Sequence, residues 1–177
     1  VDGLTGQDAV NTAQNFDEHN NFVPSFDHDK GLLKLIFGRS FLEAINTKKY
    51  PKRKQQHKAP LEVNFVNGAF MFFRKSTFDK VNGFDQNIFL YFEEMDICYR
   101  IRKQGLKCVL LPQAEIVHFQ GASTGISTAL KKEGFISYLY VLKKNYSSTR
   151  YGTILSKVFE SISLESFISE TSLNPFD

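Results

Sequence analysis

Several residue types and patterns are scarce in this 177-residue chain, and each absence excludes a class of protein. The chain has no tryptophan and only two cysteines, Cys98 and Cys108, which lack the paired spacing of a zinc site or a disulfide framework. Such cysteines fit a reduced, cytoplasmic protein best. No apolar run approaches the roughly 20 residues of a membrane-spanning helix, and no signal segment opens the sequence. The sequence therefore predicts a protein that does not span a bilayer.

Acidic residues are missing from KKYPKRKQQHK, Lys48 to Lys58, which carries six lysines and arginines. The simplest interpretation is a solvated, mobile loop between two packed elements. The alternative is a contact with anionic lipid headgroups or a phosphorylated substrate, because each basic residue near an anionic membrane contributes about 1 kcal/mol. The net charge of the whole chain is only +3, and no nucleic-acid-binding motif accompanies the run, so we do not expect nucleic acid as a partner.

What the chain does contain indicates an α/β fold with a sizeable core, since 42% of its residues are hydrophobic and 18 are phenylalanine. Apolar residues at helical intervals predict helices over 31–46 with a weak point at Gly38, over 76–82 with Ser76 as N-cap, over 93–105, over 127–145 and along 153–168. β-favouring residues predict strands over 61–75 with a bend near Asn67-Gly68, over 106–112 and over 115–119, the last two separated by a turn at 112–114. The first thirty residues are rich in Asn, Asp and Gly, so we expect them to be irregular and to add little core.

The stretch FLYFEEMDICYRIRKQG, Phe89 to Gly105, places Glu93, Glu94 and Asp96 directly after large apolar side chains. These acids are either the ordinary acidic first turn of a helix or a site that includes a catalytic base. Asp96 and Arg100 stand four residues apart, a spacing that predicts an ion pair on one helix face. Composition alone does not choose between the two interpretations.

A series of motifs supports the catalytic interpretation. In order, the chain carries Gly68-Ala69, Gly83-Phe84-Asp85, LYFEEMDICYR, Gly105, a strand ending in Pro112, and His118 followed by Gly121 and Ser123. This stretch, from Val66 to Thr124, resembles the second half of the catalytic domain of inverting family 2 glycosyltransferases, especially the rhamnosyltransferase-like branch. The resemblance implies the C-terminal part of a GT-A-type mixed-sheet fold, followed by a helical tail.

The resemblance also implies a role for each matched residue. The base that deprotonates the acceptor hydroxyl falls on Glu94, where the family usually has aspartate, with Glu93 and Asp96 as further catalytic candidates. The acceptor- and sugar-binding candidates are Gly68, Ala69, Phe89, Tyr91, Phe92 and Arg100. The diphosphate-binding candidates are His118, Gly121 and Ser123, and His118 is also a candidate metal ligand. A packed histidine, a structural Asp96–Arg100 pair and an aromatic core remain the alternatives.

The first half of the family's domain, which closes on a metal-binding Asp-x-Asp, has no counterpart in this chain. The divalent cation that the family implies, Mg²⁺ or Mn²⁺, is therefore expected to bind mainly outside it. Asp27-His28-Asp29 has the right spacing but the composition of a surface turn, so we do not expect it to hold the metal. The chain begins with Val1 instead of methionine, so we expect a fragment or excised domain that is inactive when isolated.

We accordingly interpret 1–126 as the acceptor-side half of a GT-A-like catalytic domain, with an irregular 1–30 and a basic loop at 47–60, and 127–177 as a helical extension. The implied function is transfer of a sugar, with inversion, from a nucleotide-sugar donor to a saccharide or lipid-linked acceptor during cell-envelope or capsular polysaccharide synthesis. The expected location is the cytoplasm, with a peripheral position at the inner face of the cell membrane as a further option. The alternative is a non-catalytic carbohydrate-binding or interaction domain that keeps the GT-A-like scaffold. The sequence does not specify the oligomeric state.

Overall fold

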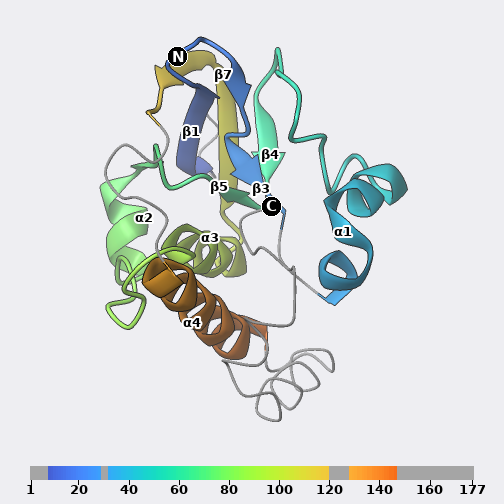
Figure 1. The fold of residues 1–177 in the computed structure, drawn as a ribbon. Coiled ribbons are helices and arrows are strands. Elements are labelled where there is room, and N and C mark those ends of the chain that lie inside the picture. Colours follow the sequence, from blue (N-terminus) through green and yellow to red (C-terminus); the bar gives the residue numbers. More distant parts are fainter. Residues whose placement is uncertain (1–7, 29–31, 120–127, 147–177) are drawn as a thin grey trace. The chain divides into compact units, whose positions relative to one another are not determined.

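The computed structural model describes residues 8–28, 32–119 and 128–146, which form a mixed α/β architecture (Figure 1). The strands are β1 Asp8–Phe16, β2 Phe22–Val23, β3 Phe26–Asp27, β4 Leu61–Val63, β5 Phe65–Val66, β6 Phe72–Phe73 and β7 Lys107–Val117. The helices are α1 Leu32–Ile45, α2 Lys75–Lys80, α3 Glu93–Lys103 and α4 Thr128–Tyr146. The predicted α/β class is confirmed, whereas the helix predicted along 153–168 lies outside the described residues.

The described residues divide into two compact units. One contains 8–28, 32–85 and 94–119, and therefore the strands, α1, α2 and nearly all of α3. The other contains 86–93 and 128–146, and therefore α4. Within the second unit the Phe92 ring packs on Tyr138, with ring centroids 5.0 Å apart. None of the helices in the described ranges has the length and apolar character needed to cross a membrane.

β1 lies in the interior of the main sheet, so the prediction of an irregular segment over the first thirty residues is wrong. It pairs in parallel with β7 along one edge and antiparallel with β2 and β6 along the other. Every side chain from Ala9 to Phe16 is buried, including Asn11, Gln14 and Asn15. Asparagine and glutamine have low strand propensity, but strand pairing on both edges outweighs that local preference. The segment expected to add little core is part of the centre of the core.

β7 is one continuous strand, where the sequence predicted two strands separated by a turn at 112–114. It pairs with β1 in parallel and with β4 antiparallel. The pairing with β1 shifts register between Leu111 and Glu115, across the expected turn. Pro112 has no N–H for the ladder, which explains why this place disrupts the pairing. The proline and its neighbours thus shift the register of the pairing, but they do not end the strand.

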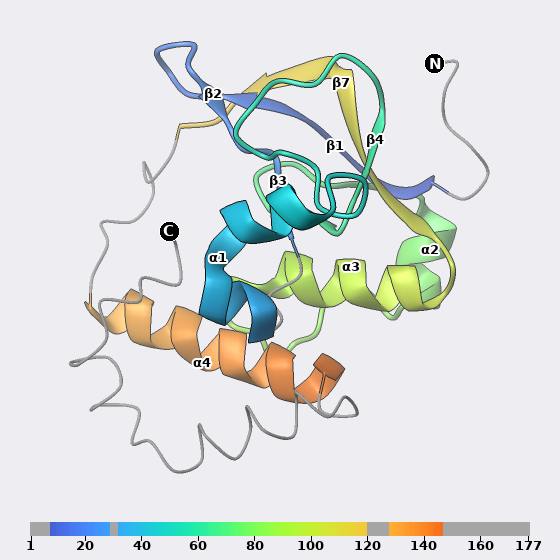
Figure 2. The same cartoon turned by 90° about the vertical axis from the view of Figure 1, so that its right-hand side faces the viewer.

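The helices agree with their predicted positions, with one local correction. α1 has a break at Gly38, whose φ of 77° and ψ of 175° are non-helical, so the predicted weak point is confirmed. α2 begins after Arg74 without a side-chain cap, so Ser76 is not its N-cap. In α3 the stripe that includes Met95, Ile97 and Ile101 is buried. Figures 1 and 2 show α3 on one side of the main sheet, with its C-terminal end leading through a short connection into β7.

The segment predicted as one bent strand, 61–75, consists of three short strands. β4 joins the main sheet beside β7, β5 pairs with β3 in a separate two-stranded sheet, and β6 pairs with β1. The bend expected near Asn67-Gly68 lies between β5 and β6, where the Ala69 N–H donates to the Asn67 side-chain oxygen at 2.9 Å. The glycine interruption therefore separates strands of different sheets.

Gly83 ends the turn after α2, and replacing it with alanine is expected to lower the free energy of unfolding by about 2–3 kcal/mol. Its φ is +62°, and an added Cβ would lie 3.0 Å from the Phe78 ring. Gly105, after α3, also has a positive φ of 73° but has open space around it. Gly105→Ala should therefore lower the free energy of unfolding only by the cost of a left-handed backbone at a residue with a Cβ, about 1–2 kcal/mol. Urea unfolding of both variants measures the difference, and equal losses would contradict the role of the Phe78 contact.

Candidate active site

The turn that leads into α3 has an unusual backbone. Tyr91 and Phe92 are consecutive non-glycine residues with positive φ, 63° and 67°. For L-residues this conformation costs about 1–2 kcal/mol each, and bulky aromatic residues seldom adopt it. Strain of this kind persists only where surrounding contacts impose it, and it clusters at functional sites.

The two adjacent glutamates open the helix immediately after this turn. Glu93 is the first residue of α3, as the sequence predicted, so Glu93 and Glu94 stand at the positive end of the helix dipole. Both side chains are half-buried. One carboxylate oxygen of Glu93 is buried and has no hydrogen-bond partner among the described residues. Buried polar atoms are normally paired, so this oxygen has acceptor capacity that the described residues do not use.

Asp96 and Arg100 form the ion pair that their spacing predicts. The Arg100 Nε and Nη2 donate to one Asp96 oxygen at 2.8 and 2.7 Å, and the Asp96 side chain is fully buried. Arg100 also donates to the Gly83 carbonyl at 2.8 Å and to the Val81 carbonyl. The guanidinium therefore ties α3 to the turn that follows α2. This arrangement supports the structural alternative for both residues.

The structure places the acceptor-side candidates in different environments. Gly68 is exposed and Ala69 half-buried, in the turn between β5 and β6. Thr12 of β1 donates to the Phe70 carbonyl at 2.8 Å, which holds that turn against the sheet. Phe89 is 81% exposed, whereas Phe92 is buried against Tyr138. The contact with Tyr138 favours a packing role for Phe92. The Phe89 ring is exposed to solvent and is therefore accessible to a ligand.

His118 follows the last residue of β7. Its backbone N–H donates to the Phe16 carbonyl at 2.8 Å, and the residue is half-buried. Among the described residues, no three His, Cys, Asp or Glu side chains lie close enough together to hold a metal ion. His118 and the acids of α3 thus do not form such a set within the described ranges. Gly121 and Ser123 lie outside the described residues.

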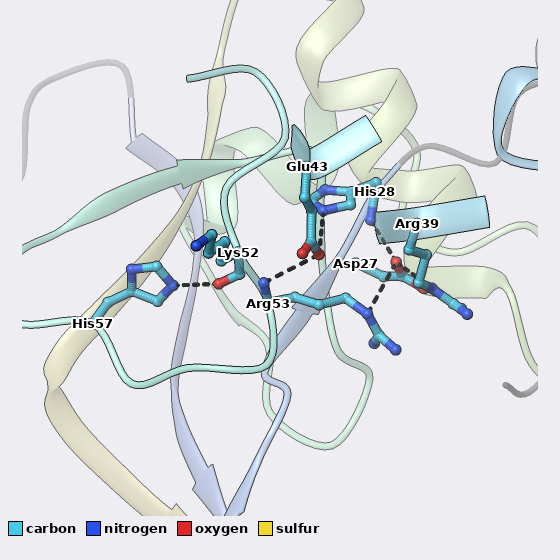
Figure 3. A network of polar contacts seen from close by, with 7 residues as sticks. All are labelled: Asp27, His28, Arg39, Glu43, Lys52, Arg53 and His57. Atoms are coloured by element: carbon cyan, nitrogen blue, oxygen red, sulfur yellow. Dashed lines mark hydrogen bonds and ion pairs between the residues drawn. The ribbon is translucent and has the colours of Figure 1, made fainter. Parts of the chain in front are cut away.

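A second polar cluster surrounds Asp27 and His28 (Figure 3). Asp27 is the last residue of β3, and its carboxylate accepts a bidentate pair of hydrogen bonds from Arg39 of α1. The Arg39 Nε donates to Oδ1 at 3.0 Å and Nη2 donates to Oδ2 at 2.6 Å. His28 is fully buried, and its Nε2 lies 3.2 Å from a Glu43 oxygen. The interpretation of this segment as a surface turn is wrong, because it is a strand end packed against a helix. The carboxylate of Asp27 forms an ion pair with Arg39.

The basic run after α1 is the loop that the sequence predicted, and a hydrogen bond ties its backbone to the same cluster. The Arg53 N–H donates to Glu43 at 3.3 Å, and the His57 N–H donates to Gln14 of β1 at 2.9 Å. The His57 Nε2 lies 2.8 Å from the Lys52 carbonyl, closing the segment on itself. Burial lowers the pKa of the Arg53 guanidinium, and the Asp27 carboxylate opposes that effect. The lysine side chains of the run, together with Gln55 and Gln56, are exposed to solvent as predicted.

Known proteins resemble this chain over most of its described length. A model of the family described as "Glycosyltransferase like family 2" matches residues 8–134. The rhamnosyltransferase WbbL of Escherichia coli (strain K12) is 31% identical over 122 residues, which cover 68% of this chain and 46% of that protein.

A second relative comes from Mycobacterium tuberculosis (strain ATCC 25618 / H37Rv). It is an N-acetylglucosaminyl-diphospho-decaprenol L-rhamnosyltransferase, 36% identical over 74 residues, which cover 41% of this chain and 24% of that protein. The chain thus spans less than half the length of the curated relatives that it matches.

Proposed function

Because the chain belongs to glycosyltransferase family 2, in its rhamnosyltransferase-like branch, and has a GT-A-like mixed α/β fold, we propose that it carries the acceptor side of an inverting sugar-transfer site. The observation that supports the proposal most is the strained Tyr91–Phe92 turn that presents Glu93 and Glu94 at the start of α3. Among these acids Glu94 is the proposed catalytic base. Glu93, with its buried unpaired oxygen, is proposed to bind the acceptor beside it.

The proposed chemistry is one displacement at the anomeric carbon. The Glu94 carboxylate takes the proton of the acceptor hydroxyl while that oxygen attacks, and the bond from the anomeric carbon to the donor's phosphate oxygen breaks. The products are the glycoside with inverted configuration and a nucleoside diphosphate. The dipole of α3 favours the ionised carboxylate, so the base is ready to accept the proton at neutral pH. Asp96 and Arg100 hold the helix that presents it.

The donor and acceptor classes follow from the family and from the names of the relatives. We propose a nucleotide-activated sugar of the rhamnose type as donor. The mycobacterial relative's name specifies a saccharide linked through diphosphate to decaprenol. We propose a lipid-linked saccharide acceptor for this chain as well, in the synthesis of a cell-envelope polysaccharide.

A divalent cation is part of this proposal through the family alone. It would neutralise charge on the donor's diphosphate. Of the described residues only His118 is proposed to contribute a ligand, and the remaining ligands would come from outside these ranges.

The direct test is a transfer assay on the complete protein with nucleotide-activated rhamnose and a diphosphate-lipid-linked saccharide. We expect a new glycosidic bond whose anomeric configuration, measured by NMR, is opposite to that of the donor. Retention of configuration would contradict the single-displacement mechanism. Binding of saccharide without any transfer would support the non-catalytic alternative.

A further inference from the structure

A strongly basic surface surrounds the end of α1 and the segment after it. Between Arg39 and Leu61 the sequence has seven lysines and arginines and one acidic residue, Glu43. The exposed members are Lys48, Lys49, Lys52, Lys54 and Lys58. This excess of one sign is far larger than the net charge of +3 for the whole chain. We refer to these five residues as the lysine patch.

The charge of the lysine patch is not cancelled within the described part of the chain. The nearby carboxylates are already engaged, Asp27 by Arg39 and Glu43 by His28 and the Arg53 N–H. None of the five lysines makes an ion pair with an acidic side chain among the described residues. Among the described residues, the patch therefore presents five positive charges that no carboxylate offsets.

The backbone that carries the patch is fixed in place. The Arg53 N–H bonds to Glu43 of α1 (Figure 3). The His57 N–H bonds to Gln14 in the sheet, and Pro51 is buried. In addition, the Tyr50 N–H donates to the Asn46 carbonyl at 2.8 Å. A surface held in this way loses little conformational entropy when it binds a partner. The anchoring thus favours a binding role over that of a flexible connector.

The solvent-facing side of α1 beside the patch is uncharged. Its exposed residues after Gly38 are Ser40, Phe41, Ala44 and Ile45. Phe41 is 40% exposed and Ile45 is 55% exposed. A surface helix normally presents charged residues to water, so an outer face of small and apolar side chains is unusual. Protein surfaces that lie in a membrane interface typically combine exposed apolar side chains with several lysines or arginines. The end of α1 and the lysine patch have this composition.

We propose that the end of α1 and the lysine patch together dock on an anionic lipid bilayer. Phe41 and Ile45 enter the boundary between headgroups and acyl chains, and the lysines contact lipid phosphates. Binding of nucleic acid would account for the positive charge of the lysine patch but not for the exposed apolar side chains of α1. The proposal places the protein peripherally on the anionic cytoplasmic leaflet, and it stands whether or not the chain transfers sugar.

Sedimentation of the complete protein with vesicles tests the proposal. We expect binding to vesicles of phosphatidylglycerol and phosphatidylcholine in equal parts, weakening with salt, and little binding to pure phosphatidylcholine. Changing Lys48, Lys49 and Lys54 to glutamine should reduce the partition coefficient about 100-fold, since each lysine near the surface contributes about fivefold. Ile45→Ser should weaken binding several-fold at every salt concentration.

The matched control changes Lys75, Lys80 and Lys103, which are exposed lysines elsewhere in the same unit, to glutamine. It removes the same charge and should leave binding within about twofold of the unaltered protein. If the control variant loses vesicle binding to the same extent, the effect depends on the net charge of the protein and not on the lysine patch, and the proposal is overturned. Equal binding to both kinds of vesicle would overturn it as well.

Discussion

Glu94→Gln is expected to reduce the rate of sugar transfer by the complete protein about 100- to 10,000-fold, the contribution that a positioned general base usually makes. The amide has nearly the same shape as the carboxylate but cannot accept the acceptor's proton. Donor affinity should stay unchanged, because the proposed role of Glu94 is on the acceptor side. Steady-state kinetics together with calorimetric titration of the donor nucleotide measures both quantities.

Glu115→Gln is the matched control, because Glu115 is an exposed glutamate on β7. It should leave turnover within about twofold, as expected for a surface change outside the site. If Glu94→Gln and Glu115→Gln behave alike, Glu94 is not the base and the binding-domain alternative gains support. Glu94→Asp restores the residue that the family usually has, so substantial activity in this variant would support a carboxylate requirement at this position.

The parts of the fold that the sequence predicted are held by contacts close in sequence. α3 begins at Glu93 and is followed by Gly105, whose positive φ matches its predicted place after the helix. β1 was missed because its buried Asn and Gln residues depend on distant partners. Gln14 donates to the Pro112 carbonyl, 98 residues away in the sequence. No local pattern shows that such a residue is buried.

The candidate site shows the same limit. Motif order identified the acids of α3, and the i, i+4 rule predicted the Asp96–Arg100 pair, but no sequence signal indicated that Arg100 also reaches the Gly83 carbonyl. The cluster around His28 was missed for a similar reason. It joins β3, α1 and the basic run, and only the spacing of Arg39 and Glu43 on one helix gave a hint of it. Residues that stabilise a site through tertiary contacts need the structure to be found.

Arg100→Ala is expected to lower the free energy of unfolding by about 3–5 kcal/mol, the loss typical of breaking a buried ion pair. It leaves the fully buried Asp96 carboxylate without its cation and removes the donor to the Val81 and Gly83 carbonyls. Asp96→Ala should cost less, because the Arg100 side chain is 21% exposed and keeps its carbonyl partners. Arg100→Lys should restore little, since an ammonium cannot reproduce the planar fork. Urea unfolding of the three variants gives the order.

Lys75 and Asp79 provide the matched control for this pair. They have the same i, i+4 spacing on a helix and a contact of 2.6 Å, but their side chains are 88% and 57% exposed. Lys75→Ala should change the free energy of unfolding by no more than about 0.5 kcal/mol, because exposed pairs on a helix contribute little. The contrast separates burial from spacing as the source of the stabilisation. If the loss at Arg100 is as small as that at Lys75, the contacts of Arg100 with Asp96 and with the Val81 and Gly83 carbonyls do not stabilise the helix that presents Glu94.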